Sequence, residues 1–491
     1  MQSHFKFDNT YAQQLEGFYA PWKGATVPSP KLVKLNLELA KKLGLDAEYL
    51  KSSEGVAVLA GSLAPEGAET LAMVYAGHQF GGFSPQLGDG RALLLGEVID
   101  RNGRRRDIHL KGSGRTPFSR GGDGKAVLGP VLREYLIGEA MYALGIPTTR
   151  ALAAVETGEK IVRDGFKRGA VLSRVAASHL RIGTFQFFAA RGETDKVKTL
   201  ADYAIDRHYR ELKEAENKYL ALLTRVIDRQ VSLVAKWVAV GFVHGVMNTD
   251  NTTISGETID YGPCAFIDHY DPKAVFSSID HQGRYAYSHQ PVILQWNLAR
   301  FAETLIELID PTDHDNAIKI ATQELEAMPD KYQDYWMAEM KAKLGLVPSQ
   351  NGDDALVTDL FEILGNDQVD YTQFFRALAK AATGDKDSVQ QLFTKPQEFT
   401  PWLTRWLGRI ETSREGATLI AKHMNGVNPV YIPRNHQVDL ALKEATGQDN
   451  MKVFEELLEL LLNPYTVVKG KETFAEPPPE GTPPCVTFCG T

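Results

Sequence analysis

Short apolar runs broken by glycines dominate the first third of the chain, and this pattern predicts strands. Residues 92–100 (ALLLGEVID) and 105–112 (RRDIHLKG) are two strand-like runs joined by an Asn-Gly turn, the strongest short-range signal of a β-hairpin. Further strand-like runs follow at 151–156 and 169–175. The chain is therefore expected to carry Lys111 at the end of the second strand of a hairpin.

Apolar residues spaced four apart predict helices after this hairpin. One helix begins near Val127 and ends at Gly145, with a proline two residues beyond. The composition turns helical from about residue 178, and the stretches 211–240 and 295–309 are predicted as helices. Strands followed by a larger helical part are an α+β pattern, for which a ligand crevice between the two parts is the usual consequence.

Composition and charge exclude several classes of partner. The 491 residues are 43% hydrophobic and carry a net charge of -8, so the chain has no general attraction for nucleic acid or an anionic membrane. The N-terminus lacks the pattern of a signal or transit peptide, and no apolar run is long enough to span a bilayer. Three cysteines in so long a chain suit a reducing compartment, so we expect a cytoplasmic protein.

The stretch HGVMNTDN, residues 244–251, followed by IDYGP, is laid out like the catalytic loop and metal-binding turn of a kinase. We interpret His244 as structural in such a loop. Where kinases place the Asp that accepts the proton of the attacking hydroxyl, two residues after the His, this chain has Val246. Asp250 is the candidate replacement, because it lies on the same loop; the alternative is that it only caps or turns the loop.

Three further features complete this kinase-like order of parts. Lys111 is expected to provide a positive charge for nucleotide phosphates, with Glu134 of the following helix as its partner; the alternative is that Glu134 is a surface carboxylate of the helix. Asn251 and Asp260 offer oxygen ligands of the kind that Mg²⁺ takes up beside phosphate oxygens. Two glycine-rich loops, 85–91 and 112–125, would let the backbone approach a ligand closely.

Several long motifs resemble the selenoprotein O family. They are GHQFGGFSPQLGDGRA, HLKGSGRTPFSRGGDGKA, VLREYLIGEAM, SRVAASHLRIGTF, HGVMNTDN, TIDYGPCAFID, DHQGRYAY and NPVYIPRNH. The resemblance runs from about residue 70 to the end. It implies a two-lobed protein-kinase-like fold, once called a pseudokinase, and transfer of AMP from ATP to Ser, Thr or Tyr hydroxyls of proteins. The nucleotide is held in a flipped orientation, so that attack falls on the α-phosphorus and pyrophosphate leaves.

The resemblance also implies a role for individual residues. Asp250 matches the proton acceptor, and Asn251 and Asp260 match the ligands of Mg²⁺ or Mn²⁺. Lys111 is similar to the phosphate-binding lysine, supported by Glu134, and Arg174 and Arg181 resemble two arginines that grip the phosphates. Without the resemblance, these two arginines would be interpreted as surface charges. The remaining nucleotide contacts that the resemblance implies are Gly88, Gly90, Arg91, Asp123 and Gly124, with Asp260 counted among them as well.

The resemblance divides the chain into a kinase-like N-terminal lobe with an extension (1–176), a helical C-terminal lobe (177–472) and a flexible proline-rich tail (473–491). Two other functions stay open at this point. One is a true kinase that uses Asp250 to direct attack on the γ-phosphate, and the other is a nucleotide-binding regulator without turnover, which the Val246 substitution suggests.

The cysteines form a separate feature. Cys485 and Cys489 lie in the tail, CVTFCGT, and Cys264 follows Asp260 by four residues. Some members of the family end in a more closely spaced cysteine pair, and the wider spacing here weakens any redox role carried over from them. A regulatory disulfide between a tail cysteine and Cys264 is the hypothesis that this placement suggests.

Overall fold

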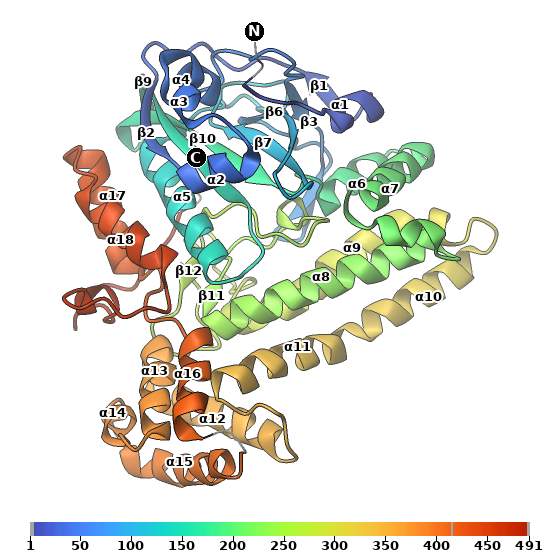
Figure 1. The fold of residues 1–491 in the computed structure, drawn as a ribbon. Helices are drawn as coiled ribbons and strands as arrows, with labels where there is room; N and C mark the ends of the chain where they lie inside the picture. The colour runs from blue at the N-terminus through green and yellow to red at the C-terminus, as the bar shows by residue number, and fades with distance from the viewer. Residues whose placement is uncertain (1–3, 414–415, 489–491) are drawn as a thin grey trace.

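An antiparallel sheet forms the strand-rich part of the molecule. The computed structural model describes residues 4–413 and 416–488. In these residues the main sheet has eight strands in the order β1-β3-β6-β7-β10-β9-β2, with β8 paired to β10 (Figure 1). The strands are β1 (Tyr19–Pro21), β2 (Lys31–Leu35), β3 (Leu71–Met73), β6 (Ala92–Ile99), β7 (Arg105–Lys111), β8 (Ala126–Val127), β9 (Arg150–Arg163) and β10 (Gly165–Ala176), with two small sheets made of β4 (Gly77–Gln79) with β5 (Gly82–Ser84) and β11 (Phe242–Val243) with β12 (Ala265–Phe266).

Both faces of the main sheet are covered. Neighbouring residues of β10 point to opposite sides, so that Val171 joins the apolar cluster under the N-terminal helices while Leu172 joins the cluster under α5 (Leu128–Ala143). Burial on both faces explains the nearly continuous apolar runs that predicted these strands. The predicted hairpin is confirmed as β6–β7, which places Lys111 at the end of β7 opposite Ala92.

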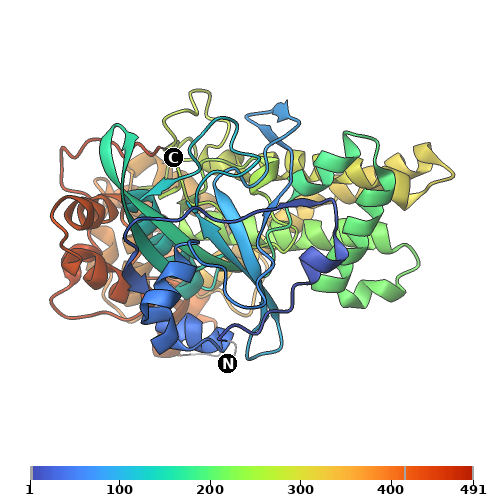
Figure 2. The same ribbon diagram turned by 90° about the horizontal axis from the view of Figure 1, so that it is seen from above.

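Helices make up most of the rest of the chain. The long pair α8–α9 runs beneath the sheet, α12 to α16 gather below, and α17 and α18 pack against α5 at the side (Figures 1 and 2). Among the described residues, none of the helices combines the length and the apolar surface that crossing a lipid bilayer requires. The other helices are α1 (Thr10–Gln14), α2 (Leu37–Leu43), α3 (Ala47–Lys51), α4 (Ser53–Leu59), α6 (Ile182–Ala189), α7 (Thr194–His208), α8 (Lys218–Val240), α9 (Gln290–Ile309), α10 (His314–Glu326), α11 (Met328–Lys343), α12 (Asp353–Asp367), α13 (Tyr371–Ala382), α14 (Asp387–Gln390), α15 (Pro396–Glu411), α16 (Ala417–Val427), α17 (Asn435–Gly447) and α18 (Lys452–Leu462), with short 3₁₀ turns η1 (Arg210–Glu214), η2 (Thr249–Asn251), η3 (Tyr287–His289) and η4 (Glu472–Phe474).

The helix predicted over 211–240 is shorter than expected. Its first residues form the 3₁₀ turn η1, and α8 begins only at Lys218. The side chain of Asn217 accepts a hydrogen bond from the backbone N–H of Leu220, and this cap fixes the true start of the helix. The helix ends where predicted, at Gly241, which adopts a left-handed conformation and turns the chain into β11 and the HGVMNTDN loop.

Candidate active site

A cavity of about 800 Å³ lies between strands β6, β7 and β10 of the sheet and the turn η2. The two glycine-rich loops, 85–91 and 112–125, form one side of it, and Val246 is also part of its wall. The residues predicted from the sequence that line this cavity are Gly88, Gly90, Arg91, Lys111, Asp123, Gly124, Arg174, Arg181, Asp250, Asn251 and Asp260. Segments far apart in the chain therefore converge on one site large enough for a nucleotide.

Lys111 connects the sheet, α5 and the IDYGP turn. Its Nζ lies 2.5 Å from Glu134 Oε2 and 2.5 Å from Asp260 Oδ1. Glu134 is only 6% exposed, so the alternative of a surface carboxylate is wrong. Burial by itself would raise the pKa of Asp260, but the Lys111 and Arg91 cations outweigh it and hold that pKa well below its usual range.

The two glycine-rich loops pack against each other through Phe118. A Cβ on Gly88 would lie 2.4 Å from the Phe118 ring, and a Cβ on Gly90 would lie 2.7 Å from the Phe118 carbonyl oxygen. These glycines thus make room for the neighbouring loop as well as for a ligand in the cavity.

Asp123 is held by a residue that the sequence did not suggest. Arg163, at the end of β9, donates to both carboxylate oxygens of Asp123, at 2.8 and 2.9 Å, and also to the carbonyl of Lys125 at 2.9 Å. Hydrogen bonds from Arg163 lower the pKa of Asp123. The carboxylate of Asp123 therefore fixes the loop over the cavity.

Arg174 and Arg181 are buried, with exposures of 4% and 5%, so the interpretation as surface charges is wrong. Arg174 lies on β10 and bonds to Glu134 at 3.2 Å. Arg181 precedes α6, where its guanidinium lies 4.4 Å from the centre of the Tyr75 ring and donates to the backbone carbonyl of Asp250 at 2.8 Å. Arg181 also lies 3.9 Å from Asp89 Oδ1, so each of these two cations has a carboxylate partner within the protein, and phosphate groups in the cavity would be additional acceptors for their N–H groups.

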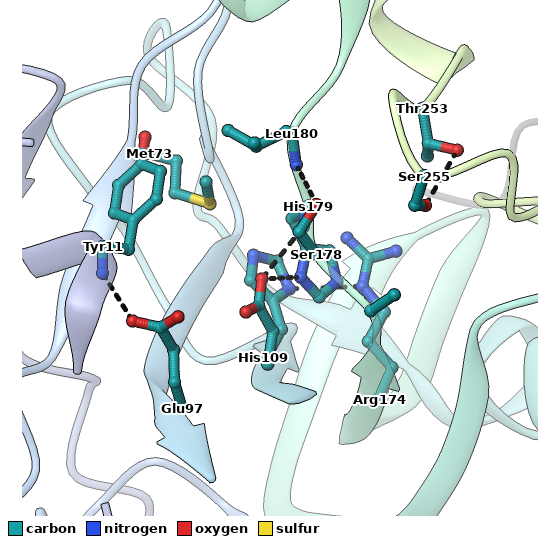
Figure 3. Close-up of polar contacts among 12 residues, drawn as sticks. Tyr11, Met73, Glu97, His109, Arg174, Ser178, His179, Leu180, Thr253 and Ser255 are labelled. Carbon is teal, nitrogen blue, oxygen red and sulfur yellow. Dashed lines mark hydrogen bonds and ion pairs between the residues drawn. The ribbon is translucent and has the colours of Figure 1, made fainter. Parts of the chain in front are cut away.

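His109 and Asp89 orient Arg174 through a chain of hydrogen bonds. The Nε of Arg174 lies 3.2 Å from His109 Nδ1, and His109 Nε2 lies 3.1 Å from Asp89 Oδ2. An arginine can only donate, so Nδ1 of His109 must accept; Nε2 then carries the proton and donates to Asp89. Burial lowers the pKa of His109 and, together with Arg174, outweighs the opposing effect of the Asp89 carboxylate. Figure 3 shows this imidazole stacked on that of His179, with ring centres 4.2 Å apart, beside Arg174.

The HGVMNTDN loop is held by His244 at its start. His244 Nε2 lies 2.9 Å from the carbonyl oxygen of Ile259, and its Nδ1 accepts from the backbone N–H of Val246. The ring is buried and has no contact with the cavity. Its geometry agrees with the structural role predicted for it.

Asp250 presents a carboxylate to the cavity. Gln79 Nε2 donates to Oδ2 at 3.1 Å, whereas Oδ1 is buried and has no hydrogen-bond partner. Burial raises the pKa of Asp250 to about 6. The neighbouring Asn251 donates through its amide nitrogen to the carbonyl of Val246, which leaves the amide oxygen free to bind a ligand.

Sequence reasoning missed Gln79, Asp89, His109 and Arg163. A signal existed for His109, because it precedes Lys111 by two positions on a predicted strand and must share its face. Asp89 stands between the two glycines of the first loop. Gln79 lies in the motif GHQFGGFSPQLGDGRA, which was used only for the resemblance, whereas nothing local marked Arg163.

Two of the cysteines lie within the described residues. Cys264 and Cys485 are both free thiols. Burial raises the pKa of Cys264 to about 12 and that of Cys485 to about 11, so neither is an activated thiolate. Cys489 lies outside the described residues.

Comparison with known proteins gives a consistent result. The family model described as "Protein adenylyltransferase SelO" matches residues 2–462. The chain is 57% identical over 489 residues to the protein nucleotidyltransferase YdiU of Cereibacter sphaeroides strain KD131, covering 99% of this chain and 100% of that protein. It is 54% identical over 487 residues to YdiU of Rhizobium rhizogenes strain K84 (99% and 97% covered) and 53% identical over 493 residues to YdiU of Rhodopseudomonas palustris strain HaA2 (100% and 100%).

Proposed function

The chain belongs to the SelO family of protein adenylyltransferases, and we propose that Asp250 is the general base with which it transfers AMP from ATP to a Ser, Thr or Tyr hydroxyl of a protein. The observation that carries this proposal is the position of the buried Asp250 carboxylate in the wall of the nucleotide-sized cavity, with its Oδ1 lacking a hydrogen-bond partner within the protein. Gln79 holds the other oxygen, so the free one has a defined direction. A raised pKa also suits a group that must take up a proton.

In the proposed reaction, Asp250 removes the proton of the acceptor hydroxyl as its oxygen attacks the α-phosphorus. A new O–P bond forms, the bond from the α-phosphorus to the bridging oxygen breaks, and pyrophosphate leaves with that electron pair. Four cations in the cavity wall, Arg91, Lys111, Arg174 and Arg181, would bind the phosphates and neutralise the charge that develops on them. Most of the catalysis is then positioning and electrostatics.

Asn251 and Asp260 would hold Mg²⁺ or Mn²⁺. A free amide oxygen and a carboxylate kept ionised by Lys111 are suitable hard ligands, with phosphate oxygens and water completing the set. No cluster of three or more His, Cys, Asp or Glu able to bind a metal occurs in the described part of the chain, so the proposed site would need the nucleotide to supply further ligands. When bound, the ion would supply charge neutralisation at the phosphates.

We infer a two-lobed, protein-kinase-like arrangement for the whole chain. Residues 1–176 would form the N-terminal lobe, 177–472 the helical lobe and 473–491 the tail. Support comes from the order of parts: Lys111 on a strand, Glu134 on the next helix, and a long helix that leads into the loop of Asp250 and Asn251.

Labelled ATP tests the proposal. Protein from a cell lysate should retain the label from ATP labelled at the α-phosphate and none from ATP labelled at the γ-phosphate. Asp250→Asn, which keeps the shape of the side chain, should lower the rate by about 10²–10⁴, the usual contribution of a general base. Asp315→Ala, an exposed carboxylate on α10, is the matched control and should keep full activity.

Three results would contradict the proposal. Retention of the γ label would make the protein a kinase. An Asp250→Asn protein as active as the wild type would show that Asp250 is not the general base. Undiminished transfer in the presence of a chelator would overturn the roles of Asn251 and Asp260.

A further inference from the structure

A short hairpin with exposed aromatic tips stands at the mouth of the cavity. It consists of β4 and β5, joined by Phe80 and Gly81, and in Figure 2 it projects as a blue loop from the edge of the molecule. Both turn residues have positive φ, 50° for Phe80 and 84° for Gly81. A bulky residue rarely adopts this conformation, which costs about 1 kcal/mol or more and persists where the surroundings impose it.

The HGVMNTDN loop and Tyr285 hold the hairpin in this conformation. The backbone N–H of Phe80 donates to Asn248 Oδ1 and to the Tyr285 hydroxyl, both at 3.2 Å. The backbone N–H of His78 donates to Thr249 Oγ1 at 2.7 Å, and Gln79 holds Asp250. The hairpin therefore stands in a fixed position relative to the proposed base.

Large apolar side chains face solvent at this place. Phe80 is 38% exposed and Phe83 is 41% exposed, although both rings pack edge-on or tilted against Tyr285 and His78. Ile279, from the segment that follows β12, is 50% exposed and shares the wall of the cavity with Phe80. Exposed aromatic residues beside an active site are typical of a surface that binds another protein.

The same surface carries cations without acidic partners. The guanidinium of Arg284 lies 4.9 Å from the Trp296 ring, close to the turn at Gly81, and Arg191 bonds to the carbonyl of Pro85 just after β5. Asp280 accepts from the backbone N–H of Arg284 at 2.9 Å, but within the described residues neither arginine side chain forms an ion pair with a carboxylate; they contact Trp296 and Phe187 instead. In a chain with net charge -8, an arginine side chain that has no ion pair beside the cavity favours an acidic partner.

We propose that Phe80, Phe83, Ile279 and Arg284, here called the hairpin ridge, bind the acceptor protein. The segment of the acceptor protein that would bind this ridge has apolar and acidic side chains on either side of its hydroxyl residue. The apolar neighbours contact the two phenylalanines and Ile279, and the acidic one pairs with Arg284. This inference rests on the proposed function, because the ridge selects the acceptor whose hydroxyl must reach Asp250.

Two random copolymers, poly(Glu,Tyr) and poly(Lys,Tyr), serve as acceptors with α-labelled ATP. We expect the wild-type protein to label poly(Glu,Tyr) more efficiently. The double variant Phe80→Gly/Phe83→Ala keeps the N–H of residue 80 and the left-handed turn. It should raise KM for poly(Glu,Tyr) about tenfold, the effect of losing one well-packed anchor, while KM for ATP stays the same. Arg284→Glu should reverse the preference between the two polymers.

Phe166→Ala is the matched control, since Phe166 is a 76% exposed aromatic at the start of β10, away from the cavity. The role of the ridge would be overturned if the double variant had the kinetics of the wild type. It would also be overturned if the wild-type protein labelled the two polymers equally, or labelled neither of them. Failure of the proposed function is distinguishable, because in that case lysate proteins would also carry no label from ATP labelled at the α-phosphate.

Discussion

Gly77 shows how closely neighbouring atoms pack around the proposed general base, Asp250. A Cβ at this position would lie 2.7 Å from Asp250 Oδ1 and 2.9 Å from its Cβ. Contacts this short are not observed between real side chains, so one of the two residues would have to move. Glycine at position 77 thus leaves space for the carboxylate, with no left-handed backbone conformation to explain its presence.

We therefore expect Gly77→Ala to displace Asp250 and to lower the rate of AMP transfer about a hundredfold, because small misplacements of a reacting group are costly. Thermal unfolding should change little. Gly408→Ala, in α15 with open space around it, is the control and should leave the rate unchanged. An active Gly77→Ala protein would show that the carboxylate does not need its observed position.

His109 gives a second prediction at this scale. His109→Leu cannot accept from Arg174 or donate to Asp89, whereas His109→Gln can do both with its amide. We expect the leucine variant to raise KM for ATP about tenfold with little change in kcat. The reason is that phosphate binding would be weakened equally in the ground state and in the transition state. The glutamine variant should recover most of this loss.

The split between KM and kcat separates this role from simple support of the fold. Equal behaviour of the leucine and glutamine variants, or a loss confined to kcat, would contradict the proposed orientation of Arg174. Melting curves of both proteins provide the check on folding.

Among the elements, the β9–β10 hairpin differs most from its prediction. Two short strands at 151–156 and 169–175 were expected, but the structure has one continuous ribbon from Arg150 to Ala176, with a turn at Asp164. Its outer half is polar and exposed on much of its surface. Hydrogen bonds between the two strands stabilise this outer half. Its sequence therefore lacks the apolar pattern from which a strand is predicted.

This extension contacts the loop 112–125 through Arg163, which bonds to Asp123 and to the carbonyl of Lys125. We predict that Arg163→Ala frees Asp123, raises KM for ATP severalfold and makes the loop more sensitive to trypsin, which can cut after Arg115 or Arg120. Limited proteolysis with and without ATP measures this. A loop equally protected in the variant and the wild type would contradict the prediction. A partly exposed ion pair contributes only about 1 kcal/mol, so global stability should hardly change.

At the scale of the whole molecule, Arg434 joins three distant segments. It is 1% exposed and lies 2.9 Å from Asp268 Oδ1 and 2.9 Å from Asp370 Oδ2, and it also donates to the carbonyl of Ala475. The segment after the IDYGP turn, the N-cap of α13 and the chain after α18 meet at this one side chain.

Arg434→Met should destabilise the protein by about 3 kcal/mol, because it leaves two largely buried carboxylates without their cation. Thermal unfolding measures the effect. Arg405→Ala, which breaks a half-exposed pair with Asp359, is the control and should cost at most about 1 kcal/mol. Equal melting temperatures for the two variants would show that the Arg434 cluster is not a structural junction.

The end of the chain also returns to the site. The backbone N–H of Thr487 donates to the carbonyl of Phe276 at 2.8 Å, and its hydroxyl donates to the carbonyl of Pro263 at 2.7 Å. The tail therefore lies beside the segment that carries Asp260. The disulfide suggested for Cys264 stays a prediction, because Cys264 and Cys485 are free thiols here and Cys489 lies outside the described residues.

The sequence by itself determined the β6–β7 hairpin, α5, most of α8 and the order of Lys111, Glu134, Asp250 and Asp260. These follow from turn residues, apolar periodicity and motifs, all of which act over a few neighbouring positions. Only the tertiary structure decided that Arg174 is buried, that His109 is neutral and that Asp250 has one free oxygen. Those properties depend on contacts between residues 65 and 171 positions apart, such as Arg174 with His109 and Gln79 with Asp250. No local pattern encodes such a contact, since burial and protonation are set by whatever the fold brings alongside.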